Sequence, residues 1–280
     1  MAHFVRVLPG KTFRIHPAVC SPYGADFDGD EMNIHAPQTE EARAESEVLL
    51  NVNENLFSPK NNANLLGCVQ DAVSGNYMLS EDSLSKEDAG QLLHGVGVNI
   101  NNLAKMNKGS DVFSKILPKE LSGKGINSKG FKSGKGIVLK EADSELGRSE
   151  AIELLRKVFS LGTTFLSRTG FTLSANDLDV PKSVKDKRDK IIQSAEVKTQ
   201  KIIESYYDKN MELLPGKTAE ETRELNILKV LNETRTHMGD AVKEGFPKDN
   251  LANKMISSGA KGSILNITQI ACSVGQQGLN

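Results

Sequence analysis

The residues best suited to chemistry in this sequence are three aspartates at alternate positions, Asp26, Asp28 and Asp30, separated by Phe27 and Gly29. A β-strand would point all three side chains to one face, because its side chains alternate with a period of two. Gly29 instead favours a tight loop, in which glycine's backbone freedom lets the aspartates converge on one point. Converging carboxylates repel one another, and a hard divalent cation relieves that repulsion. A site with few oxygen ligands fits Mg²⁺, which keeps several waters and binds substrate phosphates.

Two other interpretations of these aspartates have to be weighed. A calcium-binding EF-hand loop needs glycine at its sixth position and glutamate at its twelfth. Counted from Asp26, those positions hold Glu31 and Pro37, which excludes that loop. A solvated acidic turn stays open, since Asp and Gly are common turn residues and need no ligand to explain them.

Further stretches of the chain form one pattern with the aspartates. In chain order they are Glu31-Met32-Asn33, His35-Ala36-Pro37-Gln38, Glu41-Ala42-Arg43-Ala44-Glu45, Gln70-Asp71, Gly75, Ser258-Gly259-Ala260-Lys261-Gly262-Ser263, Asn266, Gln269 and Gly275-Gln276-Gln277. The whole set resembles the largest subunit of multisubunit DNA-directed RNA polymerases, whose metal motif reads Asn-Ala-Asp-Phe-Asp-Gly-Asp. It is most similar to the archaeal version, with the eukaryotic version next.

The resemblance implies DNA-templated RNA synthesis from nucleoside triphosphates. Asp26, Asp28 and Asp30 would hold a catalytic Mg²⁺, and a second ion would arrive with the nucleotide. The implied partners are the other polymerase subunits (the second-largest in particular), the DNA template, the RNA transcript, the nucleotides and a transcript-cleavage factor at the funnel. Lys261 would contact the triphosphate, although a plain helix start explains its glycine-rich loop equally well. The protein would work in the cytoplasm if archaeal-like and in the nucleus if eukaryotic.

One position departs from the family pattern. Gly24 stands where the family has asparagine, a residue that the resemblance places near the ribose of the incoming nucleotide. Glycine has no side chain for such a contact. We therefore expect sugar discrimination to be weakened here or taken over by another residue, whereas the metal ligands are all retained.

The predicted fold is α+β in three regions. By resemblance, residues 1–57 form an incomplete double-psi β-barrel portion with the metal loop, residues 58–175 a mixed pore region and residues 176–280 a mainly helical funnel region. Alternating apolar residues predict short strands at 4–8 and 11–16, with another at 33–36. Because this is too little β-structure to close a barrel, we expect the chain to be a fragment. The resemblance implies that the bridge helix, the trigger loop and the DNA clamp lie outside it, so we expect that it does not polymerise alone.

Helices are predicted from apolar periodicity and capping residues. Thr39 is a suitable N-cap, Ser85 pairs with Asp88, and Thr218 forms a capping box with Glu221. Two long amphipathic helices, broken at Pro215, should form an antiparallel hairpin that packs against a larger assembly. The predicted helical ranges are 39–50, 69–79, 85–93, 149–168, 182–210, 218–238, 250–257 and 264–274.

The segment from Lys105 to Lys140 is rich in lysine and glycine. It is either a surface near nucleic acid or an exposed loop kept soluble by its lysines. The whole chain of 280 residues has a formal net charge of −1, so positive charge for nucleic acid must come from patches or partners. The three cysteines have no CxxC spacing, which argues against a disulfide framework and a zinc site.

No secretion signal is visible, and no apolar run reaches the roughly 18 residues that span a membrane. Two alternative classes remain beside the catalytic one. The chain could be a non-catalytic piece whose hairpin docks cleavage factors or subunits, or a free-standing metal-dependent nuclease or transferase.

Overall fold

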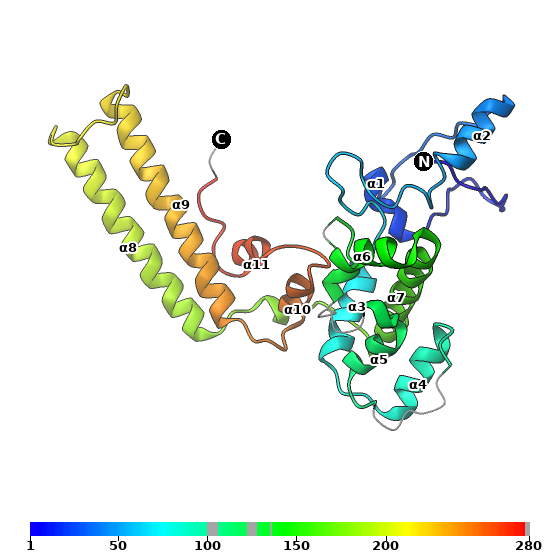
Figure 1. Cartoon of the computed structure of the whole chain (residues 1–280). Helices are drawn as coiled ribbons and strands as arrows, with labels where there is room; N and C mark the ends of the chain where they lie inside the picture. The colour runs from blue at the N-terminus through cyan, green and yellow to red at the C-terminus, as the bar shows by residue number, and fades with distance from the viewer. Residues whose placement is uncertain (100–105, 122–127, 135, 278–280) are drawn as a thin grey trace. The chain divides into compact units, whose positions relative to one another are not determined.

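The computed structural model describes residues 1–99, 106–121, 128–134 and 136–277. They form two compact units (Figure 1). The first comprises residues 1–170 with 258–260, and the second comprises residues 171–257 with those from 261 onward. The described residues are mostly helical and contain isolated β-bridges but no β-strand. The predicted helical region is therefore confirmed, the predicted β-structure is not formed among the described residues, and a double-psi barrel is not confirmed.

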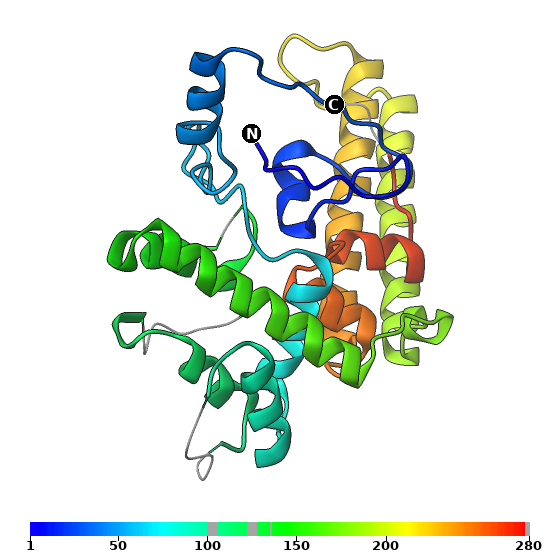
Figure 2. The ribbon, with the colours of Figure 1, turned by 90° about the vertical axis from the view of Figure 1, so that its right-hand side faces the viewer.

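The first unit is built on the crossing of α3 (Gln70–Glu81) and α7 (Arg148–Thr169), which lie side by side in Figures 1 and 2. Glycines allow the two backbones to approach. A Cβ atom on Gly75 would lie 2.0 Å from the carbonyl oxygen of Gly162. Next to this contact, the buried side-chain amide of Asn76 donates a hydrogen bond to the carbonyl of Val158 at 3.0 Å. The core around the crossing includes Ala72, Val73, Leu79, Leu154, Leu155, Val158 and Leu161.

Three further α-helices complete this core. They are α4 (Lys86–Gly95), α5 (Gly109–Ile116) and α6 (Ile137–Leu146), and the short 3₁₀ turns η2 (Lys119–Leu121) and η3 (Ser128–Phe131) lie between α5 and α6. The described parts of 105–140 are not a simple exposed loop, because α5 forms there and Phe113 and Phe131 are fully buried. The apolar side chains of α5 pack into the core of the first unit, although lysines are common in the sequence around them. The lysines Lys108, Lys115 and Lys119 are exposed, so both interpretations of the basic surface stay predictions. The rest of that prediction falls partly on residues 105, 122–127 and 135, outside the described residues.

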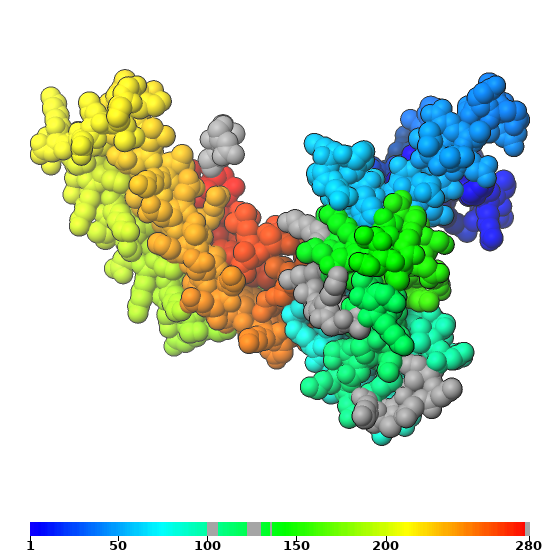
Figure 3. Space-filling view, viewed as in Figure 1, coloured from blue at the N-terminus to red at the C-terminus, as the bar shows by residue number. Residues whose placement is uncertain are grey.

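The N-terminal segment, residues 1–52, carries the aspartates. It contains η1 (Pro17–Val19), α1 (Cys20–Tyr23) and α2 (Glu40–Val48), and Thr39 caps α2 by accepting from the Ala42 N–H at 3.2 Å. The predicted strands at 4–8, 11–16 and 33–36 are not formed. Local alternation favours an extended backbone, but a strand also needs a neighbour to share its hydrogen bonds. Among the described residues those segments have no such neighbour, and Figure 3 shows part of this segment, in dark blue, projecting from the first unit.

The second unit is a long helical hairpin with short helices near its base. Helix α8 (Lys182–Tyr207) packs along α9 (Ala219–Gly245), as predicted. Thr218 and Glu221 form the expected capping box at the start of α9. The remaining elements are η4 (Ala175–Leu178), α10 (Leu251–Ser258) and α11 (Ile264–Ala271). No helix among the described residues is both long and apolar enough to cross a membrane.

Candidate metal centre

The aspartate loop begins where α1 ends. Gly24 terminates that helix in the left-handed region, with φ 60° and ψ 25°, a conformation that glycine adopts without steric cost. The Ala25 N–H still donates back to the Cys20 carbonyl at 3.1 Å, so the chain leaves the helix in a fixed direction. Gly29, with φ 126°, then turns the chain between the second and third aspartates. The loop geometry thus depends on glycine at two places.

The three carboxylates converge on one another. One oxygen from each of Asp26, Asp28 and Asp30 lies within 4.8 Å of the other two, and all three residues are exposed. Backbone N–H groups orient two of these side chains. The Asp26 N–H donates to Asp30 Oδ2 at 3.0 Å, and the Asp28 N–H donates to Asp26 Oδ1 at 3.3 Å. The loop therefore holds its own acidic side chains together in contact with solvent.

Electrostatics within the trio disfavour the fully charged state. The pKa of Asp28 is raised above its usual value, first by a hydrogen bond with the Asp26 side chain, then by the negative charge of Asp26 and, to a smaller extent, that of Asp30. Like charges held this close favour retention of a proton by one of them. A divalent cation would remove that repulsion.

The donor set fits magnesium. Mg²⁺ binds six oxygens at about 2.0–2.1 Å, which places opposite ligands about 4 Å apart. Neighbouring ligands of the same ion lie about 3 Å apart. One oxygen of each carboxylate already lies within 4.8 Å of the other two, so the side chains would draw closer together to hold the ion. Exposure leaves the remaining coordination positions to water or to substrate oxygens. Asp26, Asp28 and Asp30 could hold the ion together.

Contacts on both sides of α1 hold the element that leads into the loop. At its C-terminal end, the Tyr23 hydroxyl is hydrogen-bonded to His3 Nε2 at 2.6 Å. Before its start, the His16 ring lies 4.5 Å from the ring of Phe159 on α7. Ala18, between them, is buried in the core of the first unit. The acidic loop is thus attached to the helical core through the residues that precede it.

Arg148 makes a second attachment. From the start of α7 its guanidinium pairs with both carboxylate oxygens of Asp143, at 2.5 and 3.2 Å, and donates to the carbonyl of Glu54 at 2.5 Å. The same group lies 5.6 Å from the ring centre of Phe57. The planar fork of arginine suits this combination of contacts. Arg148 therefore fixes the chain that leaves the N-terminal segment onto α6 and α7.

Three family models match consecutive stretches of the chain. RNA polymerase Rpb1 domain 2 matches residues 1–52, domain 3 matches 55–178 and domain 4 matches 202–280. The chain belongs to the Rpb1 family of RNA polymerase largest subunits. The aspartate trio lies within the stretch that matches domain 2.

Relatives of this Rpb1-family chain are archaeal and eukaryotic. DNA-directed RNA polymerase subunit Rpo1N of Halobacterium salinarum is 38% identical over 99% of this chain and 32% of its own length. The Methanothermobacter thermautotrophicus Rpo1N is 36% identical over 99% of this chain and 36% of its own length. DNA-directed RNA polymerase III subunit RPC1 of Homo sapiens is 31% identical over 100% of this chain and 24% of its own length. The chain spans about a third of the length of these archaeal relatives.

Lys261 belongs to the second unit of this Rpb1-family chain, and the aspartates belong to the first. It is exposed in the turn between α10 and α11, where Gly259 and Gly262 have positive φ angles of 75° and 77°. The N-cap of α11 is Ser263, whose N–H donates to Asn266 Oδ1 at 2.8 Å. The loop thus leads into a capped helix start, as the plain alternative expects, and a phosphate contact of Lys261 stays a prediction.

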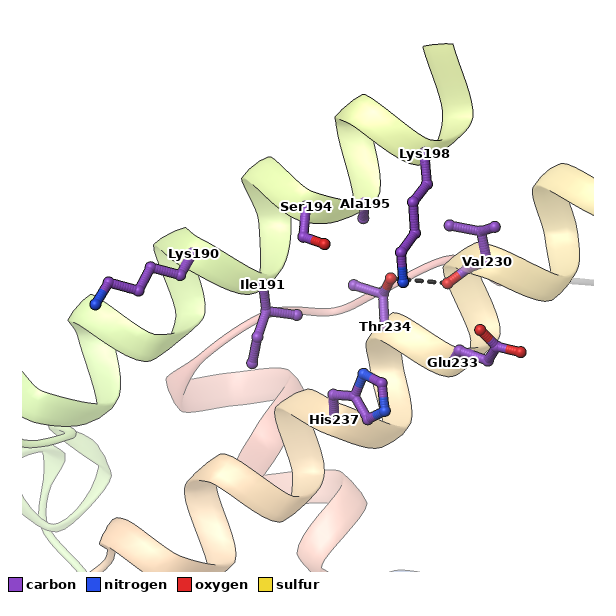
Figure 4. A pocket seen from close by; sticks show the side chains of 9 residues that line it. All are labelled: Lys190, Ile191, Ser194, Ala195, Lys198, Val230, Glu233, Thr234 and His237. Atoms are coloured by element: carbon purple, nitrogen blue, oxygen red, sulfur yellow. Dashed lines mark hydrogen bonds between the residues drawn. The ribbon is translucent and has the colours of Figure 1, made fainter. Parts of the chain in front are cut away.

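A shallow hollow of about 170 Å³ lies between α8 and α9 (Figure 4). Lys190 and Lys198 line it from α8, and Glu233 and His237 line it from α9. All four of these residues are exposed, and the Thr234 hydroxyl in the wall donates to the Val230 carbonyl of its own helix at 2.7 Å. The hollow is a groove in the hairpin surface without a buried polar group directed into it, so it carries no site.

Neither His16 nor Arg148 stands out in the sequence. The alternation of residues 11–16 predicts a strand for His16, although the following Pro17 is a signal for a first helical position. Arg148 was placed at the edge of a predicted helix, and its pairing with a carbonyl 94 residues away leaves no local sequence signal. Both residues hold the acidic loop's segment in place.

Proposed function

We propose that this chain carries the catalytic metal loop of a DNA-directed RNA polymerase, in which Asp26, Asp28 and Asp30 hold Mg²⁺ for DNA-templated RNA synthesis. The observation that carries the proposal is the convergence of three exposed carboxylates on one point, within 4.8 Å, at the aspartate motif. The bound ion would supply Lewis-acid stabilisation of the charge that develops in nucleotidyl transfer. The aspartates hold that ion, and their exposure leaves the loop open to the end of a transcript.

The chain's charge supports a role within a larger assembly. A formal net charge of −1 gives no overall attraction to nucleic acid, so the positive surfaces that hold DNA and RNA come from other subunits, the second-largest in particular. Nucleoside triphosphates are the substrates, and Lys261 contacts their phosphates. The assembly works in the cytoplasm of an archaeal-like cell or in a eukaryotic nucleus.

Reconstitution with the remaining polymerase subunits tests the proposal. We expect Asp28→Asn to lower Mg²⁺-dependent RNA synthesis at least ~100-fold, because it removes a charged ligand from the ion. Asp186→Asn, at an exposed aspartate of α8, is the matched control and should leave synthesis unchanged. Equal activity of Asp28→Asn and wild type would reject the metal role. Mg²⁺-dependent cleavage or transfer by the chain alone would favour a free-standing enzyme instead.

The hairpin supports a second function beside the catalytic one. Large apolar side chains stay exposed near its tip, with Tyr207 73%, Leu213 54% and Leu225 41% accessible. Exposed apolar surface of this kind is suited to a protein partner. We propose that the hairpin docks a transcript-cleavage factor or a neighbouring subunit. If the factor docks there, Leu213→Ser should reduce cleavage-factor stimulation while leaving elongation unchanged. An unaltered response would exclude the factor from this surface.

A further inference from the structure

The element that precedes the acidic loop is too short to be stable by itself. η1 (Pro17–Val19) and α1 (Cys20–Tyr23) together span seven residues before Gly24 ends the helix. An isolated helix of this length does not persist in water, because nucleation costs more than so few hydrogen bonds return. The contacts that hold the ends of this element therefore determine the position of the chain that leads into Asp26.

His16 holds the start of this element. It is the N-cap residue of η1, and its Nδ1 atom accepts a hydrogen bond from the Ala18 N–H at 3.1 Å. The Val19 N–H donates to the His16 backbone carbonyl at 3.0 Å. An N-cap side chain that accepts in this way satisfies a donor that the helix itself leaves free. Loss of the acceptor atom would therefore loosen the first turn.

The same imidazole ring connects that cap to the core. It lies 4.5 Å from the Phe159 ring at an interplanar angle of 60°, and Phe159 is buried on α7. Partial burial lowers the pKa of His16 below its ordinary value, which keeps the ring neutral and its Nδ1 atom able to accept. The contact with α7 and the cap are thus properties of one side chain.

We propose that His16 is a positioning residue for the aspartate trio, acting through the cap that its imidazole forms on η1. This inference rests on the proposed metal function. The aspartates bind a cation well only while the preceding turn is formed, since apparent affinity falls with the fraction of molecules in the binding-competent state.

Two substitutions separate the cap from the packing. His16→Asn keeps a side-chain oxygen that can accept from Ala18, because asparagine is among the strongest N-cap residues. His16→Leu keeps an apolar side chain against Phe159 and removes the acceptor. Wild type and Asp28→Asn complete the set. Far-UV circular dichroism will check that each 280-residue chain is folded.

The test uses two readouts on this set. Hydrogen exchange of the backbone amides of residues 18–25 is measured without metal, and Mn²⁺ affinity is measured from the paramagnetic resonance of the free ion. We expect His16→Leu to speed that exchange and to weaken Mn²⁺ binding about five-fold, the equivalent of an N-cap worth about 1 kcal/mol. His16→Asn should stay within about two-fold of wild type by the same reasoning.

Each result decides between the two proposals. Unchanged Mn²⁺ affinity in His16→Leu, with binding lost in Asp28→Asn, would overturn the positioning role and leave the metal function standing. Failure of His16→Asn to restore affinity would also overturn the role of the cap. Equal Mn²⁺ binding by wild type and Asp28→Asn would overturn the metal function itself and the positioning role with it.

Discussion

The close crossing of α3 and α7 predicts that Gly75→Ala is strongly destabilising. The new Cβ would lie 2.0 Å from the Gly162 carbonyl oxygen. The oxygen is a backbone atom and the Cβ is bonded to the backbone, so neither can move aside by a side-chain rotation. The two helices must therefore separate by about 1 Å. Such overpacking costs roughly 1–3 kcal/mol. Separation also stretches the bond from Asn76 to the Val158 carbonyl, now 3.0 Å, at a further cost of roughly 1–3 kcal/mol for a buried unsatisfied group. The higher helix propensity of alanine returns about 1 kcal/mol, which leaves a net loss of about 3 kcal/mol.

Urea unfolding followed by circular dichroism measures this loss. Gly95→Ala is the matched control, because Gly95 ends a helix of the same unit and no atom lies within 4 Å of the place that its new methyl group would occupy. We expect the control to be neutral or stabilised by up to about 1 kcal/mol. A Gly75→Ala variant whose free energy of unfolding lies within about 1 kcal/mol of the control, the gain from propensity alone, would refute the close-packing argument.

Three more predictions follow from single residues. Burial raises the pKa of the Cys68 thiol to about 12. A disulfide reagent at about pH 8 should therefore modify Cys20 and Cys272 in the native chain but reach Cys68 only after unfolding. Three reactive thiols in the native chain would contradict this. Gly239→Ala, inside α9 with its nearest contact at 3.9 Å, should raise the free energy of unfolding of the hairpin unit by about 0.5–1 kcal/mol, and a loss would argue against an open helix surface there. Gly24→Asn should fold normally, because asparagine tolerates the left-handed conformation and no atom lies within 4 Å of the added Cβ. It should increase the preference of the assembled polymerase for ribonucleotides over deoxyribonucleotides. An unchanged ratio in single-nucleotide incorporation would reject a role in sugar selection.

Helices were predictable wherever period and cap agreed locally. Thr39, Ser85 and Thr218 each accept a backbone N–H at the start of the helix they were expected to begin. A helix closes its hydrogen bonds within a few residues, so its sequence contains most of the information that forms it. The range 149–168 predicted for α7 agrees with its end at Thr169, where Gly170 is the C-cap.

Elements whose formation depends on distant partners were not predictable. The extended residues 4–8 have the alternation of a strand, yet Val7 is 95% exposed because no neighbouring strand covers it among the described residues. Helix α5 was not predicted, because distant residues bury a segment whose local sequence resembles an exposed loop. Val112, Phe113 and Ile116 are buried by the rest of the first unit, although lysines and glycines dominate the sequence around them.

The candidate site also has a local part that the sequence predicts and a long-range part that it does not. The alternate spacing of Asp26, Asp28 and Asp30 and the glycine between them are visible in the sequence, and the loop that gathers the carboxylates is local. The attachment of this loop to α7 through His16 is not visible, because it joins residues far apart in the chain.

The long-range contacts of Arg148 and Phe159 have a consequence for the order of assembly during synthesis. A ribosome makes the acidic loop before α7, and the guanidinium that fastens its segment comes 94 positions after its acceptor carbonyl. The contacts of the loop's segment with Arg148 and Phe159 therefore cannot form until α7 has emerged from the ribosome and folded. On the proposed metal function, a cation would find the anchored loop only at that later stage, and metal loading would follow translation of the first unit.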